Sequence, residues 1–157
     1  MRRSSVVHKI LLPVAHHIQR RQADCLAACA AMALDYLGRP VDYSRLIALL
    51  GVQDFGAPSS NIRRLAKLGL SVSFGQGTEA DLVSHLLHGE PCIVFLRTGE
   101  LSYWTEDTGH AVVLVGMDED TVYLNDPAFG EAPQSASRDE FFLAWLDFDC
   151  DYAVITR

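Results

Sequence analysis

The second half of the chain contains two near-continuous apolar runs, Pro91 to Arg97 and His110 to Met117. A strand with one face in water alternates apolar and polar residues, whereas a strand covered on both faces is apolar throughout. Both runs are therefore predicted to be buried strands. A third strand is predicted at Thr121 to Asn125, after a hairpin link formed by Asp118 to Thr121. Tyr152 to Thr156 is predicted to close the sheet.

The first half has a different pattern, because its apolar residues follow helical spacing between capping residues. The clearest helix is the Ala-rich run from Cys25 to Leu37, with Asp24 as its predicted N-cap and Gly38 just beyond its end. Shorter elements are predicted as helices at Tyr43 to Leu50, capped by Asp42, and at Ser59 to Leu68, Thr78 to His88 and Ser137 to Trp145, and as strands at Lys9 to Val14 and Leu70 to Phe74. Thr78 with Asp81 and Ser137 with Glu140 are predicted capping boxes. Helices followed by mostly antiparallel strands are typical of the α+β class. No linker or repeat interrupts the pattern, so residues 1–157 are predicted to form a single domain.

The composition excludes several functional classes. The 157 residues carry a net charge of -7, which argues against nucleic-acid binding because that function needs clustered Lys and Arg. No segment approaches the roughly 18 apolar residues that a membrane-spanning helix requires. The start, Met1 to Ser4, is typical of an export signal, but His8 and Lys9 interrupt the apolar run that follows. We therefore expect a soluble cytoplasmic protein without a membrane span, and export by a weak N-terminal signal stays open.

Cys25, one of four cysteines, stands at the first turn of the predicted Ala-rich helix. Unpaired N–H groups and the helix dipole favour negative charge there, so a cysteine at this position is a candidate nucleophile. Position alone is weak evidence, because such a cysteine is structural at least as often as reactive. Cys29 lies one helical turn later and His16 and His17 precede both, which raises a zinc site as an alternative. Structural zinc sites need a second close ligand pair, which the sequence lacks, so we predict no metal and no cofactor.

His110 opens the second apolar run, directly after the loop 99–109, where a side chain can face a cleft rather than the core. Asp126 comes 16 residues later, before Pro127, at the end of the next predicted strand. If these strands pair as a hairpin, the carboxylate can accept a hydrogen bond from one imidazole nitrogen and leave the other facing Cys25. Taken alone, the Asp-Pro dipeptide favours a simple turn. The three residues together predict a Cys-His-Asp triad.

A wider pattern surrounds these candidates. Gln19 precedes Cys25 by six positions, an acidic residue stands just before the cysteine, and small residues follow it along the helix. His110 begins an apolar strand with a glycine soon after it, and Asp126-Pro127 comes next. Over about residues 9 to 130, the chain thereby resembles the bacteriocin-processing, double-glycine-leader peptidases. These are bacterial papain-like cysteine peptidases that often form the N-terminal domain of peptide-exporting ABC transporters.

The resemblance implies a papain-like α+β fold in which the nucleophile lies at a helix start packed on a mainly antiparallel sheet. It also implies a hydrolase, a thiol protease that carries out proteolysis through an acyl-enzyme on Cys25. His110 would protonate the leaving amine, and Asp126 would orient the ring of His110. The side chain of Gln19 and the backbone N–H of Cys25 would bind the oxyanion, with Gln22 as a rival because it is closer to Cys25 in sequence. The implied substrate is a leader peptide or a partner protein.

Two positions are candidates for substrate contact. The family usually has glycine directly after the nucleophile, whereas this chain has Leu26, and a larger residue there can narrow the cleft and change the substrate. Trp104, in the loop before His110, is predicted to line a substrate groove or, equally, to cover the core edge. No transporter segment is present in the sequence, so we expect the protein to act alone or with a separate peptide exporter.

Two alternatives to peptide hydrolysis stay open. Papain-like deamidases, transglutaminases and acyltransferases use the same triad, and the sequence does not separate them from a peptidase because only the acceptor differs. A non-catalytic peptide-binding domain is the third possibility, as in transporter-linked relatives that have lost the cysteine. The presence of Cys25, His110, Asp126 and Gln19 argues against it.

Overall fold

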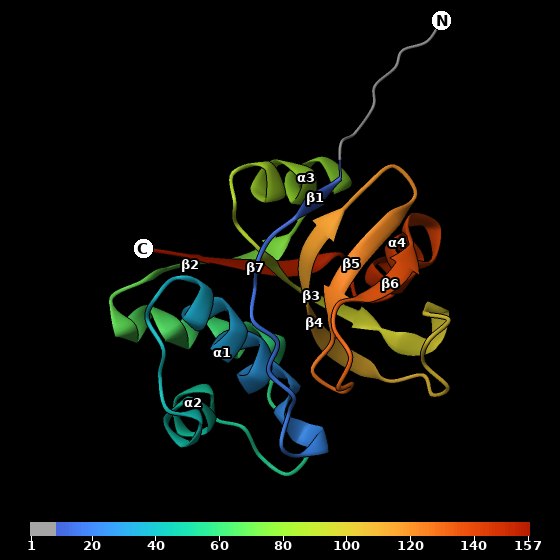
Figure 1. Cartoon of the computed structure of the whole chain (residues 1–157). Coiled ribbons are helices and arrows are strands. Elements are labelled where there is room, and N and C mark those ends of the chain that lie inside the picture. The colour runs from blue at the N-terminus through green and yellow to red at the C-terminus, as the bar shows by residue number, and fades with distance from the viewer. Residues whose placement is uncertain (1–8) are drawn as a thin grey trace, which may run out of the picture.

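A single antiparallel sheet forms the centre of the computed structural model, which describes residues 9–157 (Figure 1). Its strands are β1 (Ile10–Leu11), β2 (Ser71–Gln76), β3 (Cys92–Arg97), β4 (Gly109–Met117), β5 (Thr121–Asn125), β6 (Gln134–Ser137) and β7 (Asp151–Thr156). Within the described residues the strand order is β2-β7-β3-β4-β5-β6, and β1 pairs with β4. The mainly antiparallel sheet confirms the predicted α+β class.

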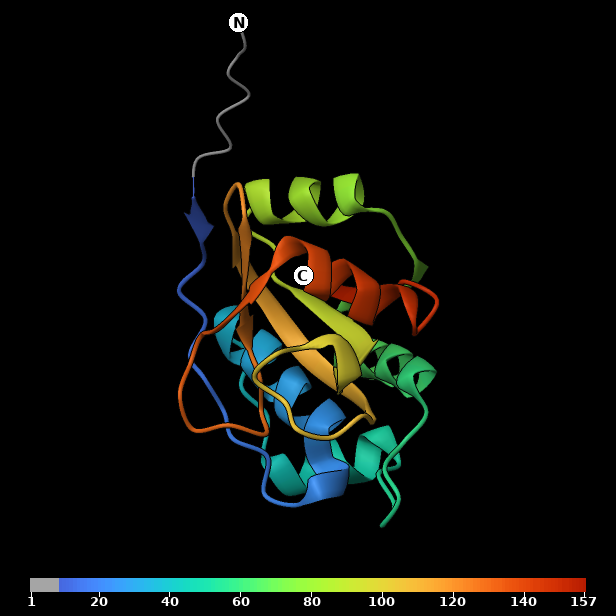
Figure 2. The ribbon, with the colours of Figure 1, turned by 90° about the vertical axis from the view of Figure 1, so that its right-hand side faces the viewer.

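Helices cover both faces of this sheet (Figures 1 and 2). The helical segments are η1 (Gln22–Asp24), α1 (Cys25–Tyr36), α2 (Tyr43–Leu50), η2 (Ser59–Leu68), α3 (Glu79–Leu87), η3 (Thr98–Glu100) and α4 (Arg138–Leu146), where η marks a 3-10 helix. One hydrophobic core lies between the sheet and α1, α2 and η2, and a second core lies on the other face, under α3 and α4. Among residues 9–157, no helix has the length and apolarity needed to cross a bilayer.

Strand β3 explains why its sequence is apolar throughout. Ile93 and Phe95 pack into the core beside α1, while Val94 and Leu96 pack into the core under α3 and α4. Alternate side chains of a strand point to opposite faces, so a strand with two covered faces needs apolar residues at every position. The prediction that this run is a buried strand is confirmed.

Helix α1 is buried almost all round. Every residue from Leu26 to Leu34 is buried, and most of these residues are alanine. Because alanine adds little bulk, the helix can pack closely against β4 on one side and α2 on another. Cys25, at the first position of α1, is only half-buried, so the packed helix presents its first side chain at the edge of the core.

The predicted elements differ from the structure in three places. The strand expected at Lys9 to Val14 has only two paired residues, because β3 occupies that side of β4 from Leu114 toward Gly109. The segment Ser59–Leu68 is a 3-10 helix rather than an α-helix. Strand β6 was not predicted, because its sequence Gln-Ser-Ala-Ser lacks an apolar alternation. The expected export-signal start, Met1 to Ser4, lies outside the described residues.

The predicted helix caps are right for two helices and wrong for two. The side chain of Thr78 caps α3 in a capping box with Asp81, and that of Ser137 caps α4. Asp24 and Asp42, predicted as caps of α1 and α2, make no side-chain cap hydrogen bond. The carboxylate of Asp24 instead accepts hydrogen bonds from the side chains of Arg21 and Tyr43.

Candidate active site

The β4–β5 hairpin brings His110 and Asp126 together as predicted. His110 is the second residue of β4, and Asp126 directly follows β5. The Nε2 atom of His110 lies 2.7 Å from Oδ1 of Asp126. Both residues are buried, with 7% of His110 and 0% of Asp126 exposed. The contact uses one ring nitrogen and leaves Nδ1 for another partner.

Asp126 accepts four hydrogen bonds within the protein. Its Oδ1 receives Nε2–H of His110 and the backbone N–H of Ala128, at 2.7 Å and 3.0 Å. Its Oδ2 receives the hydroxyl of Tyr103 at 2.8 Å and the indole N–H of Trp104 at 2.9 Å. Burial by itself would raise the pKa of Asp126, but the bond to His110 and the other donors outweigh it and lower the pKa. Asp126 therefore remains a carboxylate at neutral pH.

The ionised Asp126 in turn controls the charge of His110. Burial by itself would lower the pKa of His110, but the hydrogen bond to Asp126 and, after it, the neighbouring Cys25 outweigh this effect and raise the pKa to about 9. An imidazole with this pKa is protonated at pH 7. The site thus holds an imidazolium beside the side chain of Cys25.

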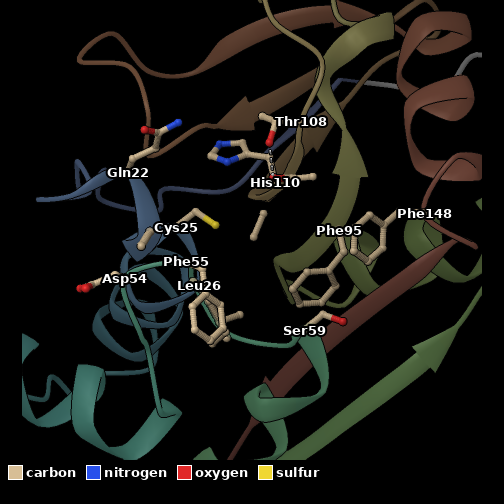
Figure 3. Close-up of a pocket in the computed structure, with 15 residues that line it drawn as sticks. Gln22, Cys25, Leu26, Asp54, Phe55, Ser59, Phe95, Thr108, His110 and Phe148 are labelled. Atoms are coloured by element: carbon tan, nitrogen blue, oxygen red, sulfur yellow. Dashed lines mark hydrogen bonds between the residues drawn. The ribbon is translucent and has the colours of Figure 1, made fainter.

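Cys25 and His110 line the same pocket, although 85 positions separate them in sequence. Figure 3 shows the sulfur of Cys25 pointing into this pocket, with the ring of His110 beside it. The other thiol of α1, Cys29, is fully buried, and burial together with the neighbouring Cys25 raises its pKa well above the ordinary value. Cys25 is therefore the thiol of α1 that is open to a reactant.

Asp24 braces the start of α1 rather than capping it. Its Oδ1 accepts hydrogen bonds from Nε and Nη2 of Arg21, at 3.2 Å and 3.1 Å, and its Oδ2 accepts the hydroxyl of Tyr43 at 3.1 Å. Because both carboxylate oxygens accept hydrogen bonds from these side chains, Asp24 does not bond to the backbone N–H groups of α1, and the N-cap prediction is wrong. The result is a link between η1 and α2 that fixes the residue before Cys25.

The pocket has a volume of about 410 Å³ and two chemically distinct parts. On one side of the pocket, Cys25 and His110 lie near the polar lining residues Gln22 and Thr108 (Figure 3). The opposite wall is apolar and aromatic. The lining residues are Gln22, Ala23, Cys25, Leu26, Asp54, Phe55, Gly56, Ala57, Ser59, Phe95, Thr108, Gly109, His110, Ala111 and Phe148.

The two glutamines that compete for the oxyanion role lie in different environments. The backbone N–H of Gln19 donates to the carbonyl of Pro127 at 2.8 Å, which ties Gln19 to the segment after Asp126. Its side-chain Nε2 donates to the carbonyl of Gln22 at 3.3 Å, and its Oε1 is buried without a partner among the described residues. Gln22 lines the pocket, whereas Gln19 does not.

The two residues predicted to contact substrate have different positions. Leu26 lines the pocket although only 3% of it is exposed, so it contributes a narrow strip of wall. Trp104 does not line the pocket. Its indole donates to Asp126, and its ring lies edge-on to that of His110 with centroids 4.9 Å apart. We therefore assign Trp104 to the support of the His110–Asp126 pair instead of to a substrate groove.

Sequence reasoning missed the aromatic wall and the donor role of Tyr103. Phe95 is one apolar residue in a buried strand, and Phe148 follows α4, so neither pattern points to a site. Phe55 offered a weak signal, because a large apolar residue between Asp54 and Gly56 in a loop has no core to join. In the structure it is 87% exposed.

The side chains of the alternative zinc site have other partners. Nε2 of His16 lies 2.7 Å from the carbonyl of Phe129, and Nε2 of His17 lies 2.5 Å from Oδ2 of Asp35. In the part of the chain that the structure describes, no three His, Cys, Asp or Glu side chains are grouped as metal ligands. The histidines before α1 therefore serve the packing of the N-terminal segment.

Comparison with known proteins places this chain in a family. The profile of the Peptidase C39 family matches residues 14–148. No curated protein sequence matches the chain. Among solved structures, a C39-like peptidase from Bacillus anthracis has a TM-score of 0.81 and 19% identity, with 96% of this chain and 98% of that chain covered.

Two transporter-associated proteases are also similar in fold. A double glycine motif protease from an AMS/PCAT transporter, solved with its leader peptide, has a TM-score of 0.71 and 22% identity, with 98% and 99% of the two chains covered. The peptidase domain of Streptococcus ComA, a bifunctional ABC transporter of a quorum-sensing pathway, has a TM-score of 0.74 and 18% identity, with 90% and 96% covered. The profile match covers most of the chain, and the chain belongs to the Peptidase C39 family of cysteine peptidases.

Proposed function

We propose that this protein cleaves a peptide bond in a leader peptide or a partner protein, with Cys25, His110 and Asp126 as its catalytic triad. The observation that carries the proposal is the 2.7 Å contact between His110 and the buried Asp126, beside a pocket that the Cys25 sulfur enters. A carboxylate on one ring nitrogen leaves the other to exchange a proton with the thiol. The thiol, the imidazole and the carboxylate then supply the nucleophile, the acid–base group and the group that orients it for acyl transfer.

The proposed reaction has two halves. The Cys25 thiolate attacks the peptide carbonyl, the C–N bond breaks, and Nδ1 of His110 gives its proton to the departing amine. Water then attacks the acyl-enzyme while His110 accepts one of its protons. The C–S bond breaks, the thiolate re-forms, and the product leaves as a carboxylic acid that gives its remaining proton to solvent. Asp126 keeps the ring oriented in both halves through its bond to Nε2.

The relatives named above support a peptide as the substrate. One structural neighbour was solved with a leader peptide, and another is the peptidase domain of a bifunctional ABC transporter. We propose a peptide substrate and a separate exporter as the partner of this chain. The test is incubation with precursor peptides followed by mass spectrometry: two fragments that sum to the precursor plus water support hydrolysis. An intact peptide changed by about one mass unit on a side chain would instead indicate a deamidase.

Activity is expected to fall as pH rises through about 9, because His110 then loses the proton that it gives to the leaving amine. The pH dependence of kcat/KM reports this group in the free enzyme. The same raised pKa stabilises the folded state fully below about 6.5, and this contribution is lost as pH rises through about 9. Circular dichroism at each pH separates loss of activity from unfolding. A profile that stays level to pH 10 in folded protein would contradict the assignment.

Gln19→Ala is expected to lower kcat by about 10²–10³-fold, the usual cost of one lost oxyanion donor. Gln22→Ala is expected to cost less than about tenfold, because the side chain of Gln22 is exposed at the pocket rim. Steady-state kinetics on one peptide compare the two variants. The reverse order of effects would assign the oxyanion role to Gln22.

A further inference from the structure

A buried carboxylate stands directly before the proposed nucleophile. Asp24 is the last residue of η1 and is only 1% exposed, and Cys25 follows it as the first residue of α1. Two negative charges at adjacent positions repel each other, and the repulsion is stronger where water does not screen them. Without a compensating cation, an ionised Asp24 would therefore oppose the thiolate form of Cys25.

Arg21 supplies the compensating charge. Its Nε and Nη2 atoms donate to the same oxygen of Asp24, at 3.2 Å and 3.1 Å, and these hydrogen bonds raise the pKa of Arg21. Tyr43 donates to the other oxygen, but burial raises the pKa of Tyr43 to about 12, so its hydroxyl is neutral at pH 7. The guanidinium of Arg20 lies over the ring of Tyr43, 4.2 Å from the centroid. Among the described residues, Arg21 is the cation that forms an ion pair with Asp24.

A second contact of Arg21 is weaker. Its Nη1 atom lies 3.4 Å from Oδ1 of Asp54, which lines the pocket from the turn between Gln53 and Gly56. The side chain of Asp54 is fully exposed, and ion pairs in water contribute little. The side chain of Asp24 is only 2% exposed, so water screens its charge much less. Arg21 therefore has its main electrostatic effect on Asp24.

The other ionisable groups near the sulfur have charges of their own to balance. His110 lies beside the sulfur from β4, and its Nε2 is 2.7 Å from Asp126, so its positive charge already faces two anions (Figure 3). Cys29, one turn later in α1, is fully buried, and burial raises its pKa, so it stays a neutral thiol. Neither group offsets the carboxylate of Asp24, which leaves that role to Arg21.

We propose that Arg21 is a positioning residue of the peptidase, which balances the charge of Asp24 and thereby keeps the sulfur of Cys25 ionised beside His110. The inference deepens the proposed function and rests on it. Arg21 contacts no reacting atom and acts through Asp24. Removal of the arginine alone makes the thiolate harder to form, removal of the carboxylate alone makes it easier, and removal of both leaves it nearly unchanged.

The test is the rate of Cys25 alkylation by iodoacetamide between about pH 3 and 8, with the modified cysteine located by mass spectrometry. This rate follows thiolate formation and needs no peptide cleavage. The midpoint of its rise is expected to move up by roughly 0.5 to 1 pH unit in Arg21→Gln, and down by a similar amount in Asp24→Asn. The double variant is expected to lie within about 0.3 pH unit of the wild type. Arg21→Lys keeps the charge and is expected to shift the midpoint by less than about half as much as Arg21→Gln.

Arg39→Gln is the matched control, because it removes the same charge beyond the other end of α1. Helix α1 has 12 residues and is about 18 Å long, which exceeds the screening length of about 8 Å at physiological ionic strength. We therefore expect this variant to keep the wild-type midpoint. Circular dichroism at each pH shows that the alkylated protein is folded.

The signs of the shifts separate a charge effect from a structural one. If Arg21 only held η1 in place, both single variants would slow alkylation, and the double variant would be no better. An unchanged midpoint in Arg21→Gln, shifts of one sign in both single variants, or an equal shift in Arg39→Gln would overturn the inference. If Arg21→Gln does not fold, the direction of the shift in Asp24→Asn decides. The expected shifts in a protein that cleaves no precursor peptide would retain the charge pairing and reject the peptidase.

Discussion

Cys25→Ala is expected to abolish peptide cleavage, with a loss on the order of 10⁶-fold, while the fold is retained. The reason is that no other thiol can replace it. Cys29 is fully buried, and Cys92 is buried as well, which raises its pKa to about 12. Cys150 is half-buried, does not line the pocket, and has a pKa raised by burial and by the adjacent acidic residues.

The matched control is Cys150→Ala, which removes a half-buried thiol outside the pocket. We expect it to keep wild-type kcat/KM, and we expect Cys25→Ala to melt within a few degrees of the wild type because Cys25 lies at the helix end. Cleavage by each purified variant is followed by mass spectrometry over hours. Residual cleavage by Cys25→Ala above about one part in a thousand would require another nucleophile and reject the proposed mechanism.

The parts of the site that sequence predicted well are close together along the chain. His110 and Asp126 lie in strands joined by a short link, so the pairing of two strands is enough to bring the side chains together. The meeting of Cys25 with His110 is different, because 84 intervening residues give many possible arrangements. Resemblance to a known family supplied that contact, since no local pattern specifies it.

The wrong cap prediction for Asp24 and the open position of Trp104 both depend on competition between hydrogen-bond partners. Asp24 satisfies the sequence rule for an N-cap, but Arg21 and Tyr43 take both of its oxygens. Trp104 was predicted to line a groove or, equally, to cover the core edge, and its indole N–H finds a partner in the buried carboxylate of Asp126. Which donor wins such a competition is decided by tertiary packing, and a linear sequence does not record it.

The aromatic wall of the pocket was beyond local prediction for a related reason. Its rings come from a turn, a central strand and the segment after α4. These three segments are far apart along the chain, so no local sequence pattern links them. Phe95 has the same pattern as its neighbours in β3, all of which are simply core residues in a linear view. Phe95 lines the pocket beside the thiol only because β3 lies next to α1 and to the end of α4.

Asp126→Asn is expected to cost about 10⁴-fold in kcat/KM, the loss that the same change causes in a serine protease triad. An amide keeps the size of the carboxylate but has only one acceptor oxygen. If its NH₂ faces His110, Nε2 must become the acceptor, so the ring proton moves to Nδ1 and the neutral ring cannot take a proton from Cys25. If the NH₂ faces the other way, it meets the indole N–H of Trp104, which cannot act as an acceptor.

The same change is expected to destabilise the fold by about 1–3 kcal/mol for each buried donor left unpaired. With the NH₂ toward His110, that donor is the backbone N–H of Ala128, and otherwise it is the indole of Trp104. Urea unfolding measures this loss, and single-turnover cleavage measures the loss of activity.

Asp118→Asn is the matched control, because Asp118 also accepts a tyrosine hydroxyl and backbone N–H groups at a strand end, yet lies outside the pocket. It is expected to keep wild-type kcat/KM and to lose less stability than Asp126→Asn, because its carboxylate is near solvent.

The alkaline limb of the pH–activity profile tests independently whether Asp126 governs His110. Without the charge of Asp126 the raised pKa of His110 loses its main support, so any residual activity of Asp126→Asn must fall at a lower pH than the wild-type limb near 9. A folded Asp126→Asn protein that keeps both more than about a tenth of its activity and the wild-type limb would show that this carboxylate does not govern His110.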